Sequence, residues 1–262
     1  MAPSSHAGRS LVEFLVTLLI GLAPVACGLF VLSLQVERKQ EETIAVTARE
    51  AIYAIDRVLD TLHQSSSMVL NLASQSCDTA LADLRRQAIM QPNVRTLVLV
   101  KDNRAFCSTL YGTFDRLIDP GTFLNQRLRV DPGNDATPDA AVLLYRLQEF
   151  PYGVLAVANI NVLQKELLGF QNAVVLSLQF GQQYVWSTGN GEYARVPNHE
   201  EDNMRLTSEQ FGYTVHAGYP DGHTWLMIRQ ASLAALPSLL LVGILTATVA
   251  YWGLYRRNRR SS

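Results

Sequence analysis

A cysteine followed by two hydroxyl residues is the stretch of this sequence with the clearest chemical potential. Residues 104–112, RAFCSTLYG, place Cys107 after an apolar run and directly before Ser108 and Thr109. A cysteine can serve as a nucleophile, as a metal ligand or as half of a disulfide. The chain contains only three cysteines. The choice between these chemistries depends on the compartment, because disulfides persist where the environment is oxidising.

Nucleophilic and metal chemistry both find little support in the sequence. No histidine lies near Cys107, and none of the five histidines stands in a recognisable nucleophile motif. The acidic loop at 196–204 offers His199, Glu200, Glu201 and Asp202. Adjacent loop residues point apart into water, and no second cluster of ligands has suitable spacing. We therefore expect neither a catalytic residue nor a metal or other cofactor.

Two long apolar runs divide the chain. Residues 11–34 contain one charge, Glu13, and residues 231–255 contain none. Each run is long enough to cross a hydrocarbon core as a helix, which takes roughly 20 residues. We predict transmembrane helices at 11–34 and 231–255, short tails at 1–10 and 256–262, and a domain at 35–230 between the helices.

The basic residues beside these runs predict the orientation. Arg9 precedes the first run, and the second run is followed by four arginines: Arg256, Arg257, Arg259 and Arg260. Loops on the cytoplasmic side carry an excess of Lys and Arg, so both termini are expected in the cytoplasm and the domain outside it. The formal net charge of -1 gives no reason to expect a nucleic-acid partner.

Two other interpretations of the first run are weaker. The core of a cleaved secretory signal is shorter than this run. A lipoprotein signal is suggested by small residues before Cys27, but Pro24 and the apolar sequence that continues after Cys27 argue against it. A membrane helix remains the best interpretation.

The outer segment begins with a long amphipathic helix. Residues 37–73 are free of Pro and Gly, and apolar residues recur at spacings of three and four. They are Ile44, Ala48, Ala51, Ile55, Val58, Leu59 and Leu62. Helices of this kind that continue a membrane span commonly pair, so we expect a homodimer through residues 37–62, with Ala48, Ile55 and Leu62 at the seam. The alternative is that the same stripe packs on the chain's own sheet.

A second helix and a set of short strands follow. The second helix is expected at 78–90, and a short one at 161–171. Strands are predicted at 94–100, 105–111, 141–148, 153–160, 173–180, 184–188 and 213–219, with a turn at Asp102-Asn103. This pattern indicates an α+β fold, a long N-terminal helix with an antiparallel sheet. By analogy it looks like the PAS/Cache-like extracytoplasmic sensors of bacterial receptors.

With this topology, Cys77 and Cys107 lie outside the cytoplasm. An even count in an oxidising compartment makes a disulfide the default. On the chain-entropy model, closing the loop between them stabilises the folded domain by about 3.5 kcal/mol. The bond can be a structural staple or a redox-responsive switch, and both remain open.

Residues 76–112, SCDTALADLRRQAIMQPNVRTLVLVKDNRAFCSTLYG, framed by two apolar runs, resemble the CSS-motif domain. This domain is the periplasmic input module of membrane-bound EAL phosphodiesterases that hydrolyse cyclic di-GMP. The resemblance maps the motif onto Cys107, Ser108 and Thr109, and the family's earlier cysteine onto Cys77. Thr109 departs from the motif's second serine but keeps a hydroxyl.

The resemblance implies a function and partners. The dithiol would be a redox switch: the oxidised form restrains the cytoplasmic phosphodiesterase, and the reduced form permits activity and is more open to proteolysis. It implies a two-pass protein of the bacterial inner membrane, acted on by periplasmic thiol-disulfide oxidoreductases and proteases.

The sequence ends at Ser262 without an EAL domain or its tripeptide on the cytoplasmic side. We therefore expect that this chain does not itself hydrolyse cyclic di-GMP, and a stand-alone sensor, a fragment and a shortened gene are all open. The alternative function is a small-molecule sensor with a purely structural disulfide, for which Tyr145, Arg146 and Tyr213 could line a polar pocket.

Overall fold

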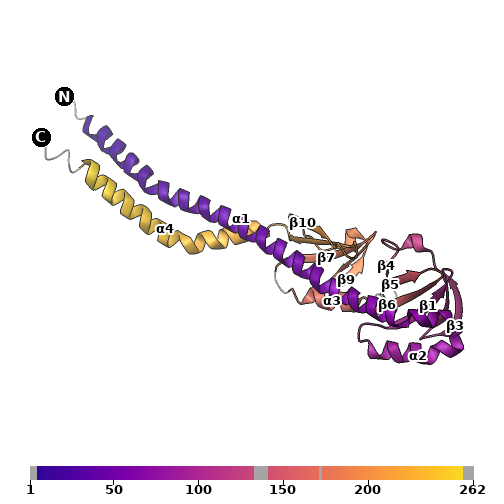
Figure 1. Cartoon of the computed structure of the whole chain (residues 1–262). Helices are drawn as coiled ribbons and strands as arrows, with labels where there is room; N and C mark the ends of the chain where they lie inside the picture. The colour runs from indigo at the N-terminus through magenta and orange to yellow at the C-terminus, as the bar shows by residue number, and fades with distance from the viewer. Residues whose placement is uncertain (1–4, 133–140, 171–172, 256–262) are drawn as a thin grey trace. The chain divides into compact units, whose positions relative to one another are not determined.

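The computed structural model describes residues 5–132, 141–170 and 173–255 and divides into two units. One unit consists of Met1–Glu42 and Gly222–Ser262, and the other of Thr43–Asp221. Long apolar helices make up the first, and the second contains antiparallel sheets with helices (Figure 1). The predicted α+β class, with two long apolar helices flanking antiparallel sheet structure, is confirmed.

The first unit is formed by α1 (Ser5–Val69), as far as Glu42, and by α4 (His223–Tyr255). Both helices are long and apolar enough to cross a membrane. A Cβ on Gly243 would lie 2.6 Å from the carbonyl oxygen of Gly21, so the two backbones approach closely. Small residues allow such approach between membrane helices.

These helices contain the predicted spans 11–34 and 231–255, whose boundaries stay predictions. The topology anchors cannot be followed further. The four arginines after the second span, Arg256, Arg257, Arg259 and Arg260, lie outside the described residues, as does the side chain of Arg9.

In the second unit, the end of α1 passes through a 3-10 turn, η1 (Leu70–Ser74), into α2 (Cys77–Met90). A six-stranded sheet follows, in the order β3-β2-β1-β6-β5-β4. Its strands are β1 (Thr96–Lys101), β2 (Arg104–Ser108), β3 (Gly112–Leu117), β4 (Leu128–Asp131), β5 (Val142–Glu149) and β6 (Tyr152–Asn159), with the 3-10 turn η2 (Pro120–Thr122) between β3 and β4.

A second, five-stranded sheet follows the short helix α3 (Asn161–Leu168). Its order is β10-β11-β7-β8-β9, and all paired neighbours are antiparallel. The strands are β7 (Val175–Phe180), β8 (Gln183–Trp186), β9 (Gly189–Gly191), β10 (Glu201–Thr207) and β11 (Thr214–Tyr219), with the 3-10 turn η4 (Tyr193–Arg195) between β9 and β10. The sequence pattern predicted antiparallel sheet structure, and the structure divides it between two sheets.

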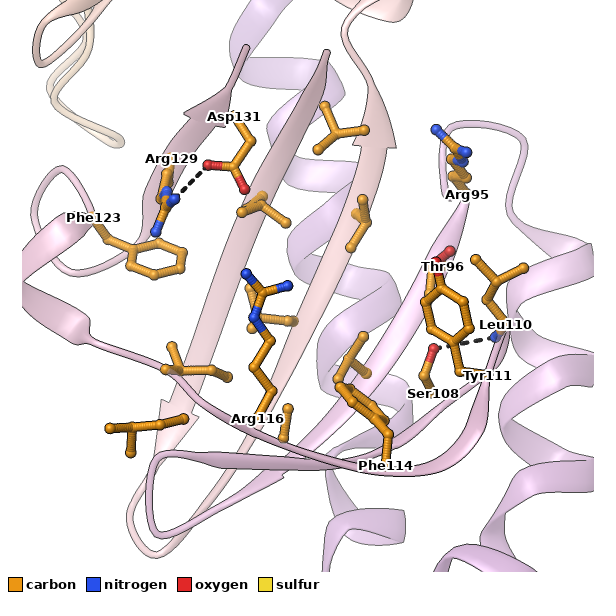
Figure 2. Close-up of a pocket in the computed structure, with 18 of the residues that line it drawn as sticks. Arg95, Thr96, Ser108, Leu110, Tyr111, Phe114, Arg116, Phe123, Arg129 and Asp131 are labelled. Carbon is orange, nitrogen blue, oxygen red and sulfur yellow. Dashed lines mark hydrogen bonds and ion pairs between the residues drawn. The ribbon is translucent and has the colours of Figure 1, made fainter. Parts of the chain in front are cut away.

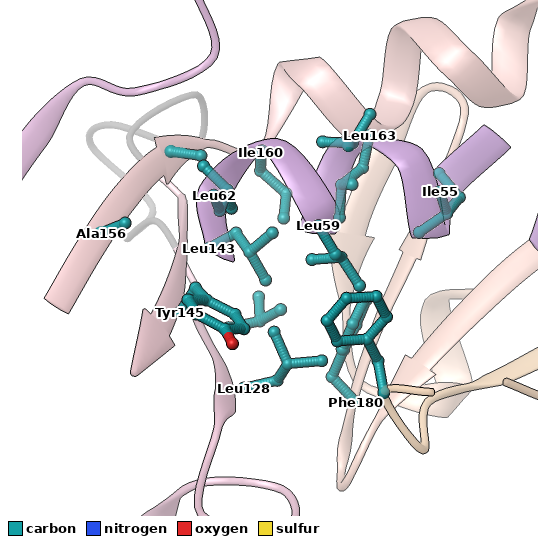
Figure 3. Packing of buried hydrophobic residues seen from close by; sticks show 14 of the residues in the cluster. Ile55, Leu59, Leu62, Leu128, Leu143, Tyr145, Ala156, Ile160, Leu163 and Phe180 are labelled. Atoms are coloured by element: carbon teal, nitrogen blue, oxygen red, sulfur yellow. The ribbon is translucent and has the colours of Figure 1, made fainter. Parts of the chain in front are cut away.

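The apolar stripe of α1 forms the centre of this unit's core. Figure 3 shows Ile55, Leu59 and Leu62 packed among side chains from both sheets and from α3. Burying each such aliphatic side chain contributes about 1.5–3 kcal/mol relative to leaving it in water. The apolar residues identified from the sequence periodicity therefore pack α1 against the sheets of the same chain.

The same burial overturns the expected dimer seam. Ala48, Ile55 and Leu62 are each 0% exposed within the single chain, so they have no surface to offer a second copy. The stripe packs on the chain's own sheets. Pairing of two chains through another surface is untested and stays a prediction.

Candidate functional site

Cys77 and Cys107 form a disulfide, with their Cα atoms 5.2 Å apart. Cys77 is the first residue of α2, and Cys107 lies in β2, an interior strand of the six-stranded sheet. Cys77 is 6% exposed and Cys107 is 0% exposed. The bond therefore joins the start of α2 to the sheet from within the core.

A β-bulge turns Cys107 toward the helices. Leu99 pairs with Cys107 and Val100 with Ala105, which leaves Phe106 as the extra residue on β2. Cys107 consequently joins the cluster that contains α1, whereas Ala105, two residues earlier, belongs to the cluster on the other face. In a regular strand the two would share a face. Bulges commonly re-aim a side chain in this way.

The turn between β1 and β2 fixes the pairs next to it, Lys101 with Arg104 and Val100 with Ala105. Asp102 and Asn103 have φ values of 49° and 59°, as a type I′ hairpin turn requires at both central positions. Asn and Asp tolerate the left-handed region better than other residues with a side chain. The predicted turn is confirmed. Its register alone would place Cys107 opposite Val98, and the bulge at Phe106 shifts Cys107 to the position opposite Leu99.

The two hydroxyl residues after Cys107 complete backbone hydrogen bonds. The Oγ of Ser108 accepts from the N–H of Leu110 at 3.2 Å, within the turn toward β3. Thr109 pairs twice with Leu97: its N–H donates to the Leu97 carbonyl at 3.0 Å, and its Oγ1 accepts from the Leu97 N–H at 3.2 Å. The Thr109 hydroxyl thus accepts the hydrogen bond of a β1 neighbour just after β2 has ended.

Because the Leu97 N–H donates to the Thr109 hydroxyl, the Thr109 carbonyl can accept a hydrogen bond from another donor. Arg85 of α2 supplies it, with Nε 3.1 Å from that oxygen. Arg85 follows Cys77 by about two helical turns, so both lie on one side of α2. The helix is held to the motif strand at two points, one covalent and one hydrogen-bonded. Sequence reasoning missed Arg85, since only its helical spacing from Cys77 could have indicated it.

A separate polar contact holds α1 to the five-stranded sheet side, and we call Asp56, Ser208 and Tyr213 the Asp56 cluster. The carboxylate of Asp56 accepts from the Ser208 hydroxyl at 2.9 Å and from the Tyr213 hydroxyl at 2.8 Å. Burial raises the pKa of Asp56, while these two hydrogen bonds act in the opposite direction. Burial, followed by the nearby Asp56 charge, raises the pKa of Tyr213.

The polar pocket considered from the sequence does not form from Tyr145, Arg146 and Tyr213. The hydroxyl of Tyr145 is 2.8 Å from Nδ1 of His63 on α1. Arg146 is buried and donates to Asn103, to Gln148 and to the carbonyl of Gln126. Tyr213 belongs to the Asp56 cluster. The three side chains serve three separate contacts.

The acidic loop at 196–204 is only partly a loop. Glu201 begins β10, at an edge of the second sheet. His199 is buried and its ring lies 6.2 Å from that of His216, centroid to centroid. Within the residues that the structure describes, no three His, Cys, Asp or Glu side chains gather as a metal site would require.

A family model described as "CSS motif domain associated with EAL" matches residues 40–232. Among curated proteins, the chain is 27% identical over 255 residues to the "Probable cyclic di-GMP phosphodiesterase PdeD" of Escherichia coli (strain K12), covering 91% of this chain and 47% of the relative. It is 20% identical over 234 residues to "Probable cyclic di-GMP phosphodiesterase PdeG" of the same organism, covering 89% and 46%. The chain spans about half the length of the curated relatives it matches.

Solved structures of sensor domains are also similar. The sensory domain of the Campylobacter jejuni chemoreceptor Tlp3 matches with a TM-score of 0.48 at 8% identity, covering 75% of this chain and 98% of that one. The sensor domain of the V. cholerae histidine kinase DctB matches with a TM-score of 0.45 at 11% identity, covering 70% and 98%.

The family model covers most of the chain, including both cysteines of the disulfide and the helix that the disulfide anchors. The chain has two helices long and apolar enough to cross a membrane, and it is similar to about half of each of two probable cyclic di-GMP phosphodiesterases. The chain belongs to the CSS-motif family, the domain associated with EAL.

Proposed function

We propose that this chain is a membrane-anchored periplasmic redox-sensing input module of cyclic di-GMP signalling, with the Cys77–Cys107 disulfide as its switch. The observation that carries the proposal is the position of the bond. The disulfide joins the first residue of α2 to an interior strand. In the sequence, α2 follows the end of α1 after the short turn η1. Its redox state therefore acts on the end of the helix whose other end belongs to the apolar unit.

A thiolate can reach the buried disulfide from the side of the residues that precede Cys77. Cys77 is preceded by three exposed residues, Ser74, Gln75 and Ser76. Thiol-disulfide exchange needs an attacking thiolate to reach one sulfur. Fraying of the first turn of α2 opens that route without disturbing the sheet, because helix ends open more readily than core strands.

The α2 dipole contributes only slightly to the potential. In the reduced protein, a Cys77 thiolate would stand at a helix N-terminus, where a negative charge gains about 0.3–1 kcal/mol. For a two-electron couple this corresponds to about 6–20 mV. The exposed carboxylate of Asp78, the next residue, opposes it. The midpoint potential is therefore governed mainly by how well α2 packs when the bond is open.

The output and partners of the switch are part of the same proposal. Two relatives carry the name of cyclic di-GMP phosphodiesterases, and the chain matches about half of each. We propose that the oxidised domain restrains such an output and that reduction releases it. Periplasmic thiol-disulfide oxidoreductases would set the state of the bond, and proteases would act on the reduced form.

Thiol labelling across a series of redox buffers tests the switch. The full chain is used in detergent with Cys27→Ala, because Cys27 is a free, exposed cysteine that would add a constant signal. We expect a midpoint above about -300 mV, since inert structural bonds lie below that value. A midpoint well below -300 mV makes the bond a staple and contradicts the proposal.

Orientation is tested by reporter fusion. We propose that both termini are cytoplasmic and that residues 35–230 are periplasmic in the bacterial inner membrane. Alkaline phosphatase fused after residue 120 is expected to be active, because that enzyme needs the oxidising side of the membrane. An inactive fusion at this position would overturn the orientation and the redox proposal with it.

A homodimer remains proposed, through a different face of α1. Val46 and Tyr53 are exposed apolar residues that lie seven positions apart, as on one side of a paired helix. Single cysteines at these two positions should cross-link between chains. Cysteines at Ala48 and Ile55, which are buried, are the matched controls and should not. Equal cross-linking at all four positions, or none, counts against this seam.

A further inference from the structure

The six-stranded sheet has a second face, and a pocket of about 370 Å³ is hollowed into it (Figure 2). One face carries the cluster that contains α1 and the disulfide. The other face carries a smaller apolar cluster, which provides the floor of the pocket. The floor residues include Val98, Ala105, Phe114, Phe123, Leu144 and Leu155.

Two acidic and three basic side chains line this pocket, and they are not used alike. Arg129 pairs with Asp131 at 2.6 Å, and its guanidinium also donates to Thr122 at 3.0 Å. The carboxylate of Asp119 accepts from the N–H of Gly121 at 2.9 Å. Both carboxylates are therefore already engaged within the protein.

The other two arginines are available. Arg95 and Arg116 line the pocket, and among the described residues neither guanidinium has a hydrogen-bond or ion-pair partner. Figure 2 shows the Arg116 side chain reaching across the apolar floor and Arg95 at another edge of the pocket. A guanidinium offers a planar fork of donors that matches a carboxylate.

We propose that this pocket binds a small organic anion, a carboxylate on an apolar body, with Arg116 as the main anchor. The volume lies within the range of small-molecule sites, which combine an apolar lining with a few placed polar groups. The floor receives the apolar body, and the free guanidinium receives the carboxylate. An inorganic anion would leave the floor uncovered, so the apolar lining favours an organic one.

Ser108 supplies a further polar group. It lines the pocket, and because its Oγ accepts from the Leu110 N–H, its own hydroxyl proton remains free to donate. Cys107, its neighbour, points to the opposite face of β2. The pocket therefore does not include the disulfide. The proposal goes beyond the redox function and holds whether the disulfide is a switch or a structural bond.

Calorimetric titration of the oxidised full chain in detergent tests the site. The probes are hexanoate and indole-3-acetate, with hexanamide and indole-3-acetamide as uncharged counterparts and inorganic phosphate as a non-organic anion. We expect at least one carboxylate to bind about tenfold or more tightly than its amide and than phosphate, because hydrogen bonds to a charged partner are the stronger ones.

Substitution identifies the anchor. Arg116→Gln should weaken carboxylate binding about tenfold or more while leaving the melting temperature unchanged, since the side chain is exposed and has no described partner. Arg86→Gln is the control: Arg86 is an exposed arginine of α2, paired with Asp83 and outside the pocket. Carboxylates that bind no better than their amides or phosphate, or equal effects of the two substitutions, overturn the proposal.

Discussion

The two sheets are attached to helices by different chemistry. The six-stranded sheet is tied to α2 by a disulfide and by one arginine, and it meets α1 through apolar packing and the His63–Tyr145 contact. The five-stranded sheet also packs its apolar residues on α1, and its side of the domain is joined to α1 by the Asp56 cluster. Reduction breaks the disulfide, whereas the Asp56 cluster is broken only by losing a hydrogen-bond partner. Reduction can therefore release α2 from the six-stranded sheet while the Asp56 cluster still holds α1.

The largest effect is expected from removing the covalent tie. Replacing Cys77 and Cys107 together by Ala should lower the free energy of unfolding by about 2–5 kcal/mol, as loss of a native disulfide does. Urea denaturation of the full chain in detergent measures this. Cys27→Ala is the matched control and should change nothing, because Cys27 makes no disulfide. A double variant as stable as the parent would mean that the bond constrains nothing.

The Asp56 cluster should rank second. Asp56→Ala leaves the hydroxyls of Ser208 and Tyr213 without their shared acceptor, so we expect a loss of about 1.5–3 kcal/mol. Asp60→Ala is the control on the same helix. It removes an exposed hydrogen bond from Gln210, for which less than about 1 kcal/mol is expected. Equal losses in the two variants would contradict the role of Asp56, again by urea denaturation.

The hydroxyl of the motif's third residue gives a smaller effect. Thr109→Val keeps the shape of the side chain but removes the acceptor for the Leu97 N–H, with an expected cost of about 1 kcal/mol. Thr109→Ser keeps the hydroxyl and should lie closer to the parent. If serine were as disruptive as valine, packing of the methyl group and not the hydrogen bond would explain the position.

The last effect is absent at neutral pH and concerns a proton on the five-stranded sheet. Burial, followed by Arg205 and His199, lowers the pKa of His216 to about 4. The unfolded chain then binds a proton near pH 6.5 that the folded chain takes up only near pH 4, so stability falls as the pH drops through that window. His216→Gln should flatten this fall in thermal melts. Asp56, whose raised pKa acts with the opposite sign at low pH, is common to both proteins and does not affect the comparison.

Interior and edge strands differ in how far the sequence predicts them. The seven predicted strands correspond to β1, β2, β5, β6, β7, β8 and β11, none of which lies at the edge of its sheet. The four missed strands, β3, β4, β9 and β10, are the four edges. Interior strands are buried by neighbours and therefore have apolar sequences, whereas every residue of β10 (EDNMRLT) is half-buried or exposed. Polar edge strands resist pairing with other chains.

The candidate site shows the same division. The cysteine pair followed from compartment and count, and the turn at Asp102-Asn103 followed from residue type. The bulge at Phe106 that turns Cys107 inward left no sequence signal, because it depends on how two strands pair. The α1 stripe was recognised as a buried face, but periodicity does not say whether the partner is a second chain or the chain's own sheet.

Hydrogen exchange of the oxidised and reduced full chain, in the Cys27→Ala background, tests whether the disulfide is a switch. We predict that reduction accelerates exchange in residues 66–80, which contain the end of α1, η1 and the start of α2, while β10 and β11 keep their protection. Such a local change is what a switch requires. Unchanged exchange in residues 66–80 would contradict a redox switch. An equal increase across both sheets would also contradict it, because it marks a structural disulfide whose loss weakens the whole domain.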